Sequence, residues 1–523
     1  MNEKNIFSLN NILLIVAILA GLFLFCYRIG DHNLWIDEAF SLRMANKSFA
    51  DLIASVAAQD PHPPLYYLIL KYWGAIFGIS IESGVYLSIF FGFLAGIAGC
   101  YLYKLMFNKH PWIAAVLIFC SPFYIMYTRM IRYYSLASFL TVVLLIIFLK
   151  FLNSNNKKWV YLLALIHVIM IYCDYPASTI FLGEFITLCL FYRKYRDKML
   201  KLLVVFTITI IAFIPWAQKL FYHLTELSKL PSADPLSGDI KGILLRTLFT
   251  IYDFSFGECI YPWNYFIIVP LSIIFIISTI VFFYNLKKYP HNVKDNILIT
   301  ITAVFVSFLT GILMANFLVS KQSFVYMPAR LMFCFIPFIL VIANGISFMD
   351  KQKYIISIVI VILYSFVVGN FYNQTNYINP LYAINWGNAF NRVNELFEPG
   401  DIVISDESEV TDYYANIFLK NAIYFGDERT LRKYLLENPN KSYTQRIFLL
   451  LTERDSTNYA YFSTDFIMKL LSQSEILFTR EYAKTNEKYY NIKKQFFKKS
   501  YKYKMKLYLL KINSDLLRNY FLK

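Results

Sequence analysis

The chain lacks the short motifs that mark soluble nucleotide and hydrolytic chemistry. Its 523 residues contain no P-loop, no GxGxxG after a strand, no HExxH and no GxSxG. The seven cysteines include no CxxC pair, which excludes zinc ribbons and redox pairs, and none follows Cys334. The first apolar run has no small-residue cleavage site and passes directly into Tyr27 and Arg28, which predicts a retained anchor.

Charged residues are also scarce in this chain. They make up 16% of it, against 58% hydrophobic and 19% aromatic residues, and this composition is too apolar for a soluble protein. It predicts a multi-pass membrane protein. Much of the net charge of +16 lies in short loops and near the C-terminus, where membrane orientation and anionic lipid explain it. We therefore expect no nucleic-acid partner.

Long apolar runs predict a polytopic α-helical membrane domain over residues 1–370, because about 20 apolar residues cross a bilayer. Lys and Arg fall in alternate short loops, which places the N-terminus inside and the loops 28–82 and 217–262 outside. We expect segment 64–79 to form an interfacial helix and not a span. A crossing there would reverse the side of every later loop and break the pattern of Lys and Arg in the inside loops. We expect about eleven spans, near residues 11–27, 83–107, 111–126, 134–152, 158–174, 176–192, 199–216, 263–286, 296–319, 331–349 and 354–370.

The chain changes in character after residue 370. Charged and polar residues become frequent, and no apolar run is long enough to span a membrane. An amphipathic pattern at 386–397 predicts a helix, and PGDIVISD at 399–406 predicts a turn that leads into a strand. We expect a soluble α/β domain over residues 371–523, placed outside by the odd number of spans.

The stretch 30–67 contains two adjacent acids in an apolar setting. In LWIDEAF, Asp37 and Glu38 lie among large apolar side chains, where burial raises the pKa of a carboxyl group and suits it to act as a general base. Helix capping or simple solvation is the alternative interpretation. Further along, Asp60 and His62 precede two prolines that favour an extended turn.

Two functions are open for the Asp60 and His62 pair. It either forms a structural turn or contributes, with Asp31 and His32, to a divalent metal site, since Asp and His are common metal ligands. Both interpretations place the pair on the outer side. His62 is also a candidate substrate-binding residue.

Basic residues on the expected outer side are candidates for binding an anionic phosphate. Arg129 and Arg132, with Tyr133 beside them, lie in MYTRMIRYYS, and Lys321 and Arg330 lie in KQSFVYMPAR. They oppose the positive-inside trend, which phosphate binding would explain. Ordinary snorkelling to the interface is the alternative.

Two further acids lie in or beside expected spans. Glu184 lies within 176–192, where a charge requires a partner or a proton, and it either serves the site or anchors helices together. Asp174 lies at the outer end of the preceding span. His167 is interpreted as a packing histidine whose hydrogen bonds are satisfied.

Four stretches together resemble glycosyltransferase family 39, the lipid-linked-sugar transferases that include protein O-mannosyltransferases and lipid A aminoarabinose transferase. They cover most of residues 11–350 in the family's order. These stretches are LWIDEAFS, PHPPLYYLILKYWGAIFG, SPFYIMYTRMIRYYS and FVYMPARLMFCFIPFILVIA.

The resemblance implies a GT-C fold, outward-facing catalytic loops and a polyprenyl-phosphate sugar as donor. Asp37 would act as the base on an acceptor hydroxyl, with Glu38 beside it, and Arg132 and Arg330 would be phosphate or structural partners. Transfer would invert the anomeric carbon if displacement is single-step. The acceptor would be an envelope lipid, glycan or protein at the cell membrane, which is the cytoplasmic membrane in a bacterium.

Three positions depart from the family pattern. Met130 stands where many members have an acid, Pro61-His62 where aminoarabinose transferases have Glu-Lys, and Asp174 where a His is frequent. The sugar therefore stays open. A flippase or transporter of lipid-linked glycans is the alternative function, since it also needs many spans and basic sites for lipid phosphate.

Overall fold

The computed structural model describes residues 8–229, 235–320, 326–419, 423–438, 446–453, 462–484, 486–497, 504–513 and 516–521. The chain forms two compact units. One comprises Met1–Gly30 and Met44–Asn376, and the other comprises Asp31–Arg43 and Tyr377–Lys523. Residues 31–43 thus group with the C-terminal part of the chain, although the sequence analysis had assigned them to the membrane domain. Lys321 lies outside the described residues.

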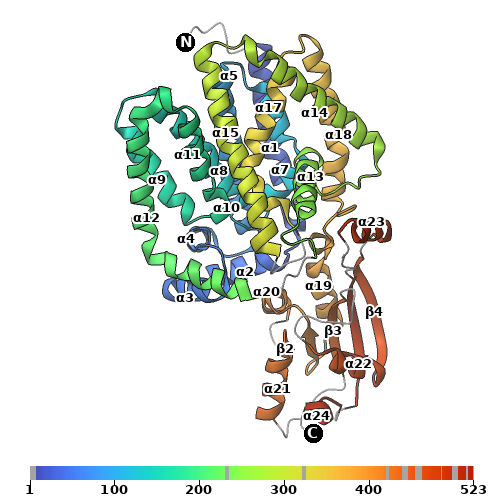
Figure 1. The fold of residues 1–523 in the computed structure, drawn as a ribbon. Coiled ribbons are helices and arrows are strands. Elements are labelled where there is room, and N and C mark those ends of the chain that lie inside the picture. Colours follow the sequence, from blue (N-terminus) through green and yellow to red (C-terminus); the bar gives the residue numbers. More distant parts are fainter. Residues whose placement is uncertain are drawn as a thin grey trace. The chain divides into compact units, whose positions relative to one another are not determined.

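The first unit is helical, and its long helices run side by side (Figure 1). Within the described ranges, eight helices are long and apolar enough to cross a membrane. The chain is therefore a polytopic membrane protein, as expected. The eight are α1 (Leu9–Cys26), α5 (Ile81–Phe107), α8 (Tyr134–Asn153), α12 (Tyr192–Lys229), α14 (Tyr265–Asn285) continued by η3 (Leu286–Lys288), α15 (His291–Met314) continued by η4 (Ala315–Val319), η5 (Pro328–Cys334) continued by α17 (Phe335–Ser347), and α18 (Gln352–Tyr372).

The expected count of eleven spans is not confirmed, because three of the expected segments form shorter helices. The run 111–126 breaks at Ser121, which caps the next helix. The helix in the run 158–174 ends at Ile171 and leaves Asp174 to cap the following helix, and the run 176–192 is divided at Thr179. Such caps satisfy the N–H groups at a helix start. The shorter helices of this unit are α3 (Phe49–Gln59), α4 (Leu65–Phe77), α6 (Trp112–Phe119), α7 (Pro122–Thr128), α9 (Lys158–Ile171), α10 (Tyr175–Ser178), α11 (Ile180–Leu190) and α13 (Ile240–Phe256).

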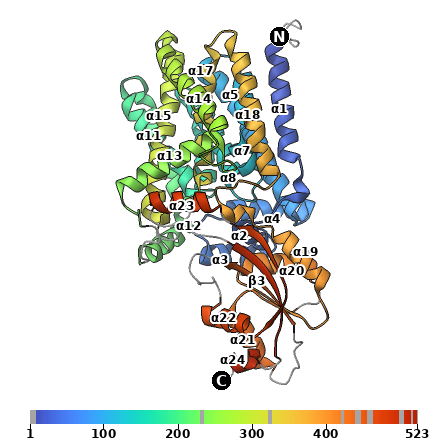
Figure 2. The same ribbon diagram turned by 90° about the vertical axis from the view of Figure 1, so that its right-hand side faces the viewer.

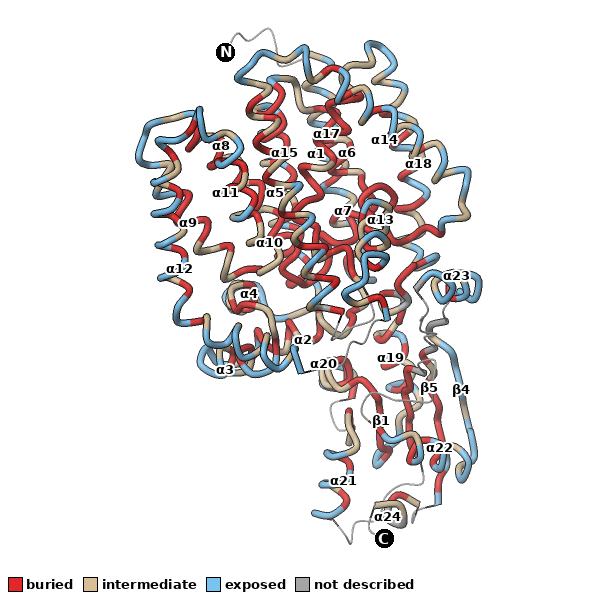
Figure 3. The backbone as a smooth tube through the Cα atoms, viewed as in Figure 1, coloured by how far each residue is buried: buried red, intermediate tan, exposed pale blue. Residues whose placement is uncertain are grey.

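Small residues allow the inner helices of the first unit to approach closely. Helices α8 and α17 are largely buried, whereas much of α12 and α18 is exposed (Figure 3). A Cβ atom added at Gly345 on α17 would lie 1.9 Å from the Ser278 carbonyl oxygen on α14, and one at Gly183 on α11 would lie 2.2 Å from the Ala303 carbonyl oxygen on α15. In a membrane, close packing of this kind stabilises helix pairs in the absence of a hydrophobic driving force.

The second unit contains a five-stranded sheet in the order β2-β1-β3-β5-β4. Figure 2 shows this sheet, with β3 labelled, between helices on its two sides. Strand β1 pairs in parallel with β2 and β3, whereas β5 pairs antiparallel with β3 and β4. This confirms the expected α/β fold of the C-terminal domain. The strands are β1 (Ile402–Ser405), β2 (Ile423–Phe425), β3 (Arg446–Glu453), β4 (Glu475–Lys484) and β5 (Lys504–Lys511).

Several helices of the second unit pack against this sheet. The β1-α20-β2-α21-β3 run makes two parallel crossovers, and its apolar residues form a core that includes Ile404, Leu431 and Leu449. Parallel strands need such crossovers, and helices usually supply them. The helices of this unit are α2 (Ile36–Ala45, whose last two residues belong to the first unit), α19 (Trp386–Leu396), α20 (Ser408–Phe418), α21 (Glu428–Glu437), α22 (Thr464–Ser472), α23 (Glu487–Phe497) and α24 (Leu516–Phe521).

Candidate active site

The loop between α3 and α4 fixes the orientation of the His62 side chain. Asp60 Oδ1 accepts a hydrogen bond from the His62 backbone N at 2.9 Å and lies 2.8 Å from His62 Nδ1. The Tyr67 hydroxyl donates to the other carboxylate oxygen. Pro63 and Pro64 follow, and they favour an extended turn before α4 starts. The carboxylate therefore holds the imidazole ring and is itself fully engaged.

The surroundings of Asp60 favour its ionised form. Burial acts to raise the pKa of this carboxyl, but the neighbouring His62 and Arg132 charges and the His62 and Tyr67 hydrogen bonds outweigh it. The net effect holds the pKa of Asp60 below its usual value. Asp60 is therefore a carboxylate at neutral pH.

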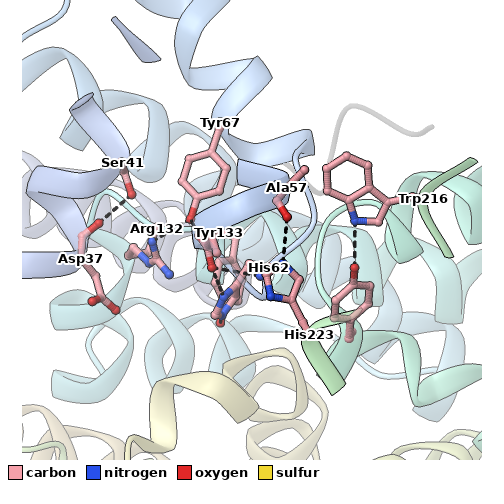
Figure 4. Close-up of polar contacts among 11 residues, drawn as sticks. Asp37, Ser41, Ala57, His62, Tyr67, Arg132, Tyr133, Trp216 and His223 are labelled. Atoms are coloured by element: carbon pink, nitrogen blue, oxygen red, sulfur yellow. Dashed lines mark hydrogen bonds and ion pairs between the residues drawn. The ribbon is translucent and has the colours of Figure 1, made fainter. Parts of the chain in front are cut away.

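The turn between α7 and α8 supplies the groups on the other side of the His62 ring. The Tyr133 hydroxyl lies 2.8 Å from His62 Nε2, and Arg132 Nη1 donates to the Tyr67 hydroxyl at 3.0 Å. Figure 4 shows the His62 ring held next to Tyr133. Both ring nitrogens thus have polar partners, one a carboxylate and one a phenol.

Two further ionisable groups act electrostatically on the same cluster. Asp174 lies in the turn between α9 and α10, outside the eight candidate spans, and one of its oxygens accepts from Ala177 N at 2.9 Å. Burial raises the pKa of Asp174 to about 6, against the opposing charges of His62, Arg330 and Arg132. Arg330 on η5 has a buried Nη1 without a hydrogen-bond partner among the described residues.

These residues form one cluster in the first unit, which we call the His62 cluster. Four segments that are distant in the sequence contribute to it: the α3–α4 connection with α4, the α7–α8 turn, the α9–α10 turn and η5. The cluster combines two carboxylates with two arginines, a histidine and two tyrosines. Its members are Asp60, His62, Tyr67, Arg132, Tyr133, Asp174 and Arg330.

Two other residues singled out from the sequence lie elsewhere. Arg129 donates to the backbone carbonyls of Tyr27 and Arg28, just beyond α1, and so closes that helix end. Glu184 has the partner that its position demanded, since its Oε2 lies 2.8 Å from His167 Nε2 and both side chains are fully buried. This pair links α9 to α11.

The adjacent acids Asp37 and Glu38 lie on α2, in the second unit, and differ in their surroundings. Glu38 is 1% exposed, and its oxygens meet His32 Nε2 at 2.9 Å and Trp35 N at 3.2 Å. The contact to Trp35 N, three residues back, is half of a capping box. Glu38 thus takes the capping role that the sequence left open. Asp37 is partly exposed, and its carbonyl accepts from the Ser41 hydroxyl at 2.8 Å.

The residues do not fit the metal site that the sequence left open. Among the described residues, no three His, Cys, Asp or Glu side chains are grouped so as to hold a metal ion. Both nitrogens of His62 already meet protein groups, and His32 Nε2 meets Glu38. These side chains are therefore held by protein partners and are not arranged as metal ligands in the part of the chain that the structure describes.

A second acidic pair, which the sequence analysis missed, lies at the end of α13. Asp253 and Glu258 are almost fully buried, and the Tyr127 hydroxyl donates to Glu258. Burial and the neighbouring Glu258 raise the pKa of Asp253 well above its usual value. The signal was present in the sequence, because YDFSFGECIYPW surrounds both acids with apolar residues, as LWIDEAF does.

Comparison with known proteins identifies the fold. A scan of protein-family models gives no match, and neither does a search of curated proteins. Among solved structures, the apo form of ArnT from Cupriavidus metallidurans matches with a TM-score of 0.54 and 8% identity, over 96% of this chain and 98% of that one. ArnT from the same organism bound to undecaprenyl phosphate matches with a TM-score of 0.53 and 9% identity, over 95% and 97%. The chain thus has a GT-C glycosyltransferase fold, as the resemblance implied.

Proposed function

We propose that this protein is a membrane glycosyltransferase that moves a sugar from a polyprenyl-phosphate donor to an envelope acceptor on the extracytoplasmic face. The observation that supports it most is the GT-C fold, which extends over nearly the whole length of ArnT, a protein that binds undecaprenyl phosphate. The absence of nucleotide-binding motifs from the sequence is consistent with a lipid-linked donor.

The His62 cluster supports the donor half of this proposal. Arg132 and Arg330 supply two guanidinium groups, which are well suited to an oxygen-rich phosphate. As the sugar–phosphate bond breaks, negative charge develops on the leaving lipid phosphate, and fixed cations stabilise that charge most effectively where water is excluded. His62, fixed by Asp60, would orient Tyr133 toward the same anion.

Asp37 is the proposed general base. It would take the proton of the acceptor hydroxyl while the acceptor oxygen bonds to the anomeric carbon and polyprenyl phosphate leaves. A single displacement of this kind inverts the configuration at that carbon. Glu38 would hold α2 in shape and not exchange protons itself, because both of its oxygens are engaged.

The donor assignment is tested by binding of undecaprenyl phosphate to the purified protein, measured by native mass spectrometry. We expect Arg132→Gln and Arg330→Gln each to weaken binding about tenfold or more, because each removes a charged hydrogen-bond donor. Arg196→Gln is the matched control, since it removes the same charge from an exposed position on α12. Equal binding by all four proteins would refute the assignment of the phosphate to the His62 cluster.

The catalytic assignment is tested by transfer of labelled sugar from polyprenyl phosphate to endogenous acceptors in membranes. We expect Asp37→Asn to abolish transfer and Glu38→Gln to reduce it less. Undiminished transfer by Asp37→Asn would remove that residue from the mechanism. Lipid translocation without any transfer by the wild type would instead favour the flippase alternative.

A further inference from the structure

The segment that carries Asp37 contacts the C-terminal part of the chain through an ion pair, a hydrogen bond and an aromatic contact. Arg43 Nη2 donates to Glu409 Oε1 at 2.6 Å. The backbone N of Leu34 donates to the Tyr414 hydroxyl at 3.4 Å. These interactions lie on either side of Asp37 in the sequence, so they restrain both ends of the segment.

The third interaction is an aromatic contact. The Trp35 and Tyr382 rings meet edge to face, with centroids 5.2 Å apart, a geometry that stabilises aromatic pairs beyond the area they bury. Trp35 is 5% exposed and directly precedes α2. The start of the helix is therefore anchored in the second unit.

Two of these partners, Glu409 and Tyr414, lie on α20, which follows β1. Glu409 is in the first turn of α20, four residues after Ser405 ends β1. From the end of β1 the chain passes through α20 to β2, on one side of β1. From the end of β3, the parallel neighbour on the other side of β1, the chain continues to the antiparallel strands farther from β1. The carboxyl ends of β1 and β3 therefore form a topological switch point, where open α/β sheets usually bind ligands.

We infer that the C-terminal domain acts as a positioning platform for the catalytic acid, with the chain's own residues 31–43 docked at the sheet edge near that switch point. Arg43 and Glu409 are the positioning residues. They touch neither donor nor acceptor, and they act through the orientation of α2 and hence of Asp37. This inference rests on the proposed function, because it assigns Asp37 its role as base.

The physical reason for a rate effect is the sensitivity of proton transfer to geometry. A general base must lie within hydrogen-bond distance of the proton that it removes, and a misplacement of about 1 Å can cost on the order of 100-fold in rate. The Arg43 and Glu409 side chains are 32% and 20% exposed, so their ion pair is partly shielded from water. Loss of this pair would free one end of α2 without removing a reacting group.

The experiment is a charge-swap cycle on the full chain in membranes: Arg43→Glu, Glu409→Arg and the double variant. We expect each single variant to lower kcat on the order of tenfold while the KM for the polyprenyl-phosphate donor stays unchanged, because the donor's proposed ligands are in the other unit. The double variant should recover most of the lost kcat, since it restores an opposite-charge pair. Lys433→Glu, at an exposed position on α21, is the control and should leave both constants unchanged.

Three outcomes would overturn the inference while leaving the proposed function intact. One is wild-type kcat in both single variants. Another is a double variant whose loss of kcat, expressed as a free energy, equals the sum of the losses in the two single variants. A third is a rise in the KM for the donor without a change in kcat. If the wild type itself transfers no sugar, the proposed function fails first.

Hydrogen exchange tests the docking without any transfer assay. Faster amide exchange over residues 34–42 in Arg43→Glu, reversed in the double variant, is the expected result. Unchanged exchange over these residues would refute the docking itself.

Discussion

The pairing of Asp60 with His62 is the feature of the His62 cluster whose energy can be predicted best. Asp60 is 7% exposed and meets the His62 ring at 2.8 Å, so the hydrogen bond is charge-assisted and mostly shielded. A hydrogen bond to a charged group contributes about 1.5–3 kcal/mol. We therefore predict a coupling energy of about 2 kcal/mol between the two side chains in a cycle of Asp60→Asn, His62→Gln and the double variant.

The single variant Asp60→Asn should lose more free energy of unfolding than this coupling energy alone. It leaves His62, Tyr67 and Arg132 arranged around a neutral amide, and breaking a buried charged network by removing one member costs about 3–5 kcal/mol. The assay is unfolding of the purified protein in mixed detergent micelles, with the free energy of unfolding determined for each variant. The control is the exposed pair Lys229 and Glu226 on α12, for which we expect no measurable coupling.

The same pair predicts a dependence of stability on pH. Because the pKa of Asp60 in the folded protein lies below its value in the unfolded chain, the stabilisation is complete above the unfolded pKa of about 3.9. It is lost as the pH falls through the lower, folded pKa. Asp60→Asn should therefore remove part of the acid sensitivity. A coupling energy near zero, or acid sensitivity equal to that of the wild type, would refute the account of this loop.

Two further predictions concern helix packing in the first unit. Gly345→Leu should lower the thermal midpoint of unfolding sharply, because its Cβ would lie 1.9 Å from the Ser278 carbonyl oxygen. Gly369→Leu is the control and should change the midpoint little, because nothing lies within 4 Å of the added Cβ. Equal midpoints for the two variants would contradict the close approach of α14 and α17. His167→Leu should destabilise the protein by about 3–5 kcal/mol, since it leaves Glu184 buried without its partner. Adding Glu184→Leu should recover most of that loss, and failure to do so would contradict the pairing.

The sequence predicted which segments are apolar helices and which belong to the α/β domain better than it predicted where each helix ends. Hydrophobicity over about 20 residues reports whether a segment prefers lipid, and on that ground the membrane class and the soluble α/β domain were predicted correctly. It does not report where a helix is interrupted. Ser121 starts a new helix within the expected span 111–126, Thr179 divides the expected span 176–192, and the helix in 158–174 ends early at Ile171, so three expected spans became shorter helices.

The site was predicted residue by residue but not as an arrangement. His62, Arg132, Tyr133 and Arg330 were all singled out, yet nothing local predicts that Tyr133 lies 2.8 Å from a ring 71 positions earlier in the chain. Contacts of that range depend on tertiary packing. The grouping of residues 31–43 with the C-terminal part was missed for the same reason, since one of its contacts, Arg43 with Glu409, joins positions 366 residues apart.

Arg129 illustrates a different limit of sequence reasoning. An arginine on the outer side satisfies the charge argument equally well whether it binds a ligand phosphate or a protein carbonyl. Only the contacts with Tyr27 and Arg28 show that its donors are directed to the backbone beyond α1. Its predicted role in substrate binding stays a prediction.

The central claim is tested most directly by one rate ratio. It is the initial rate of labelled-sugar transfer from polyprenyl phosphate in membranes with the wild type, divided by the rate with Asp37→Asn at equal protein content. General-base catalysis contributes about 10²–10⁴-fold, and we predict a ratio in that range. Transfer by the wild type with a ratio near one would contradict the assignment of Asp37, and no transfer by the wild type with any polyprenyl-phosphate sugar would contradict the proposed function.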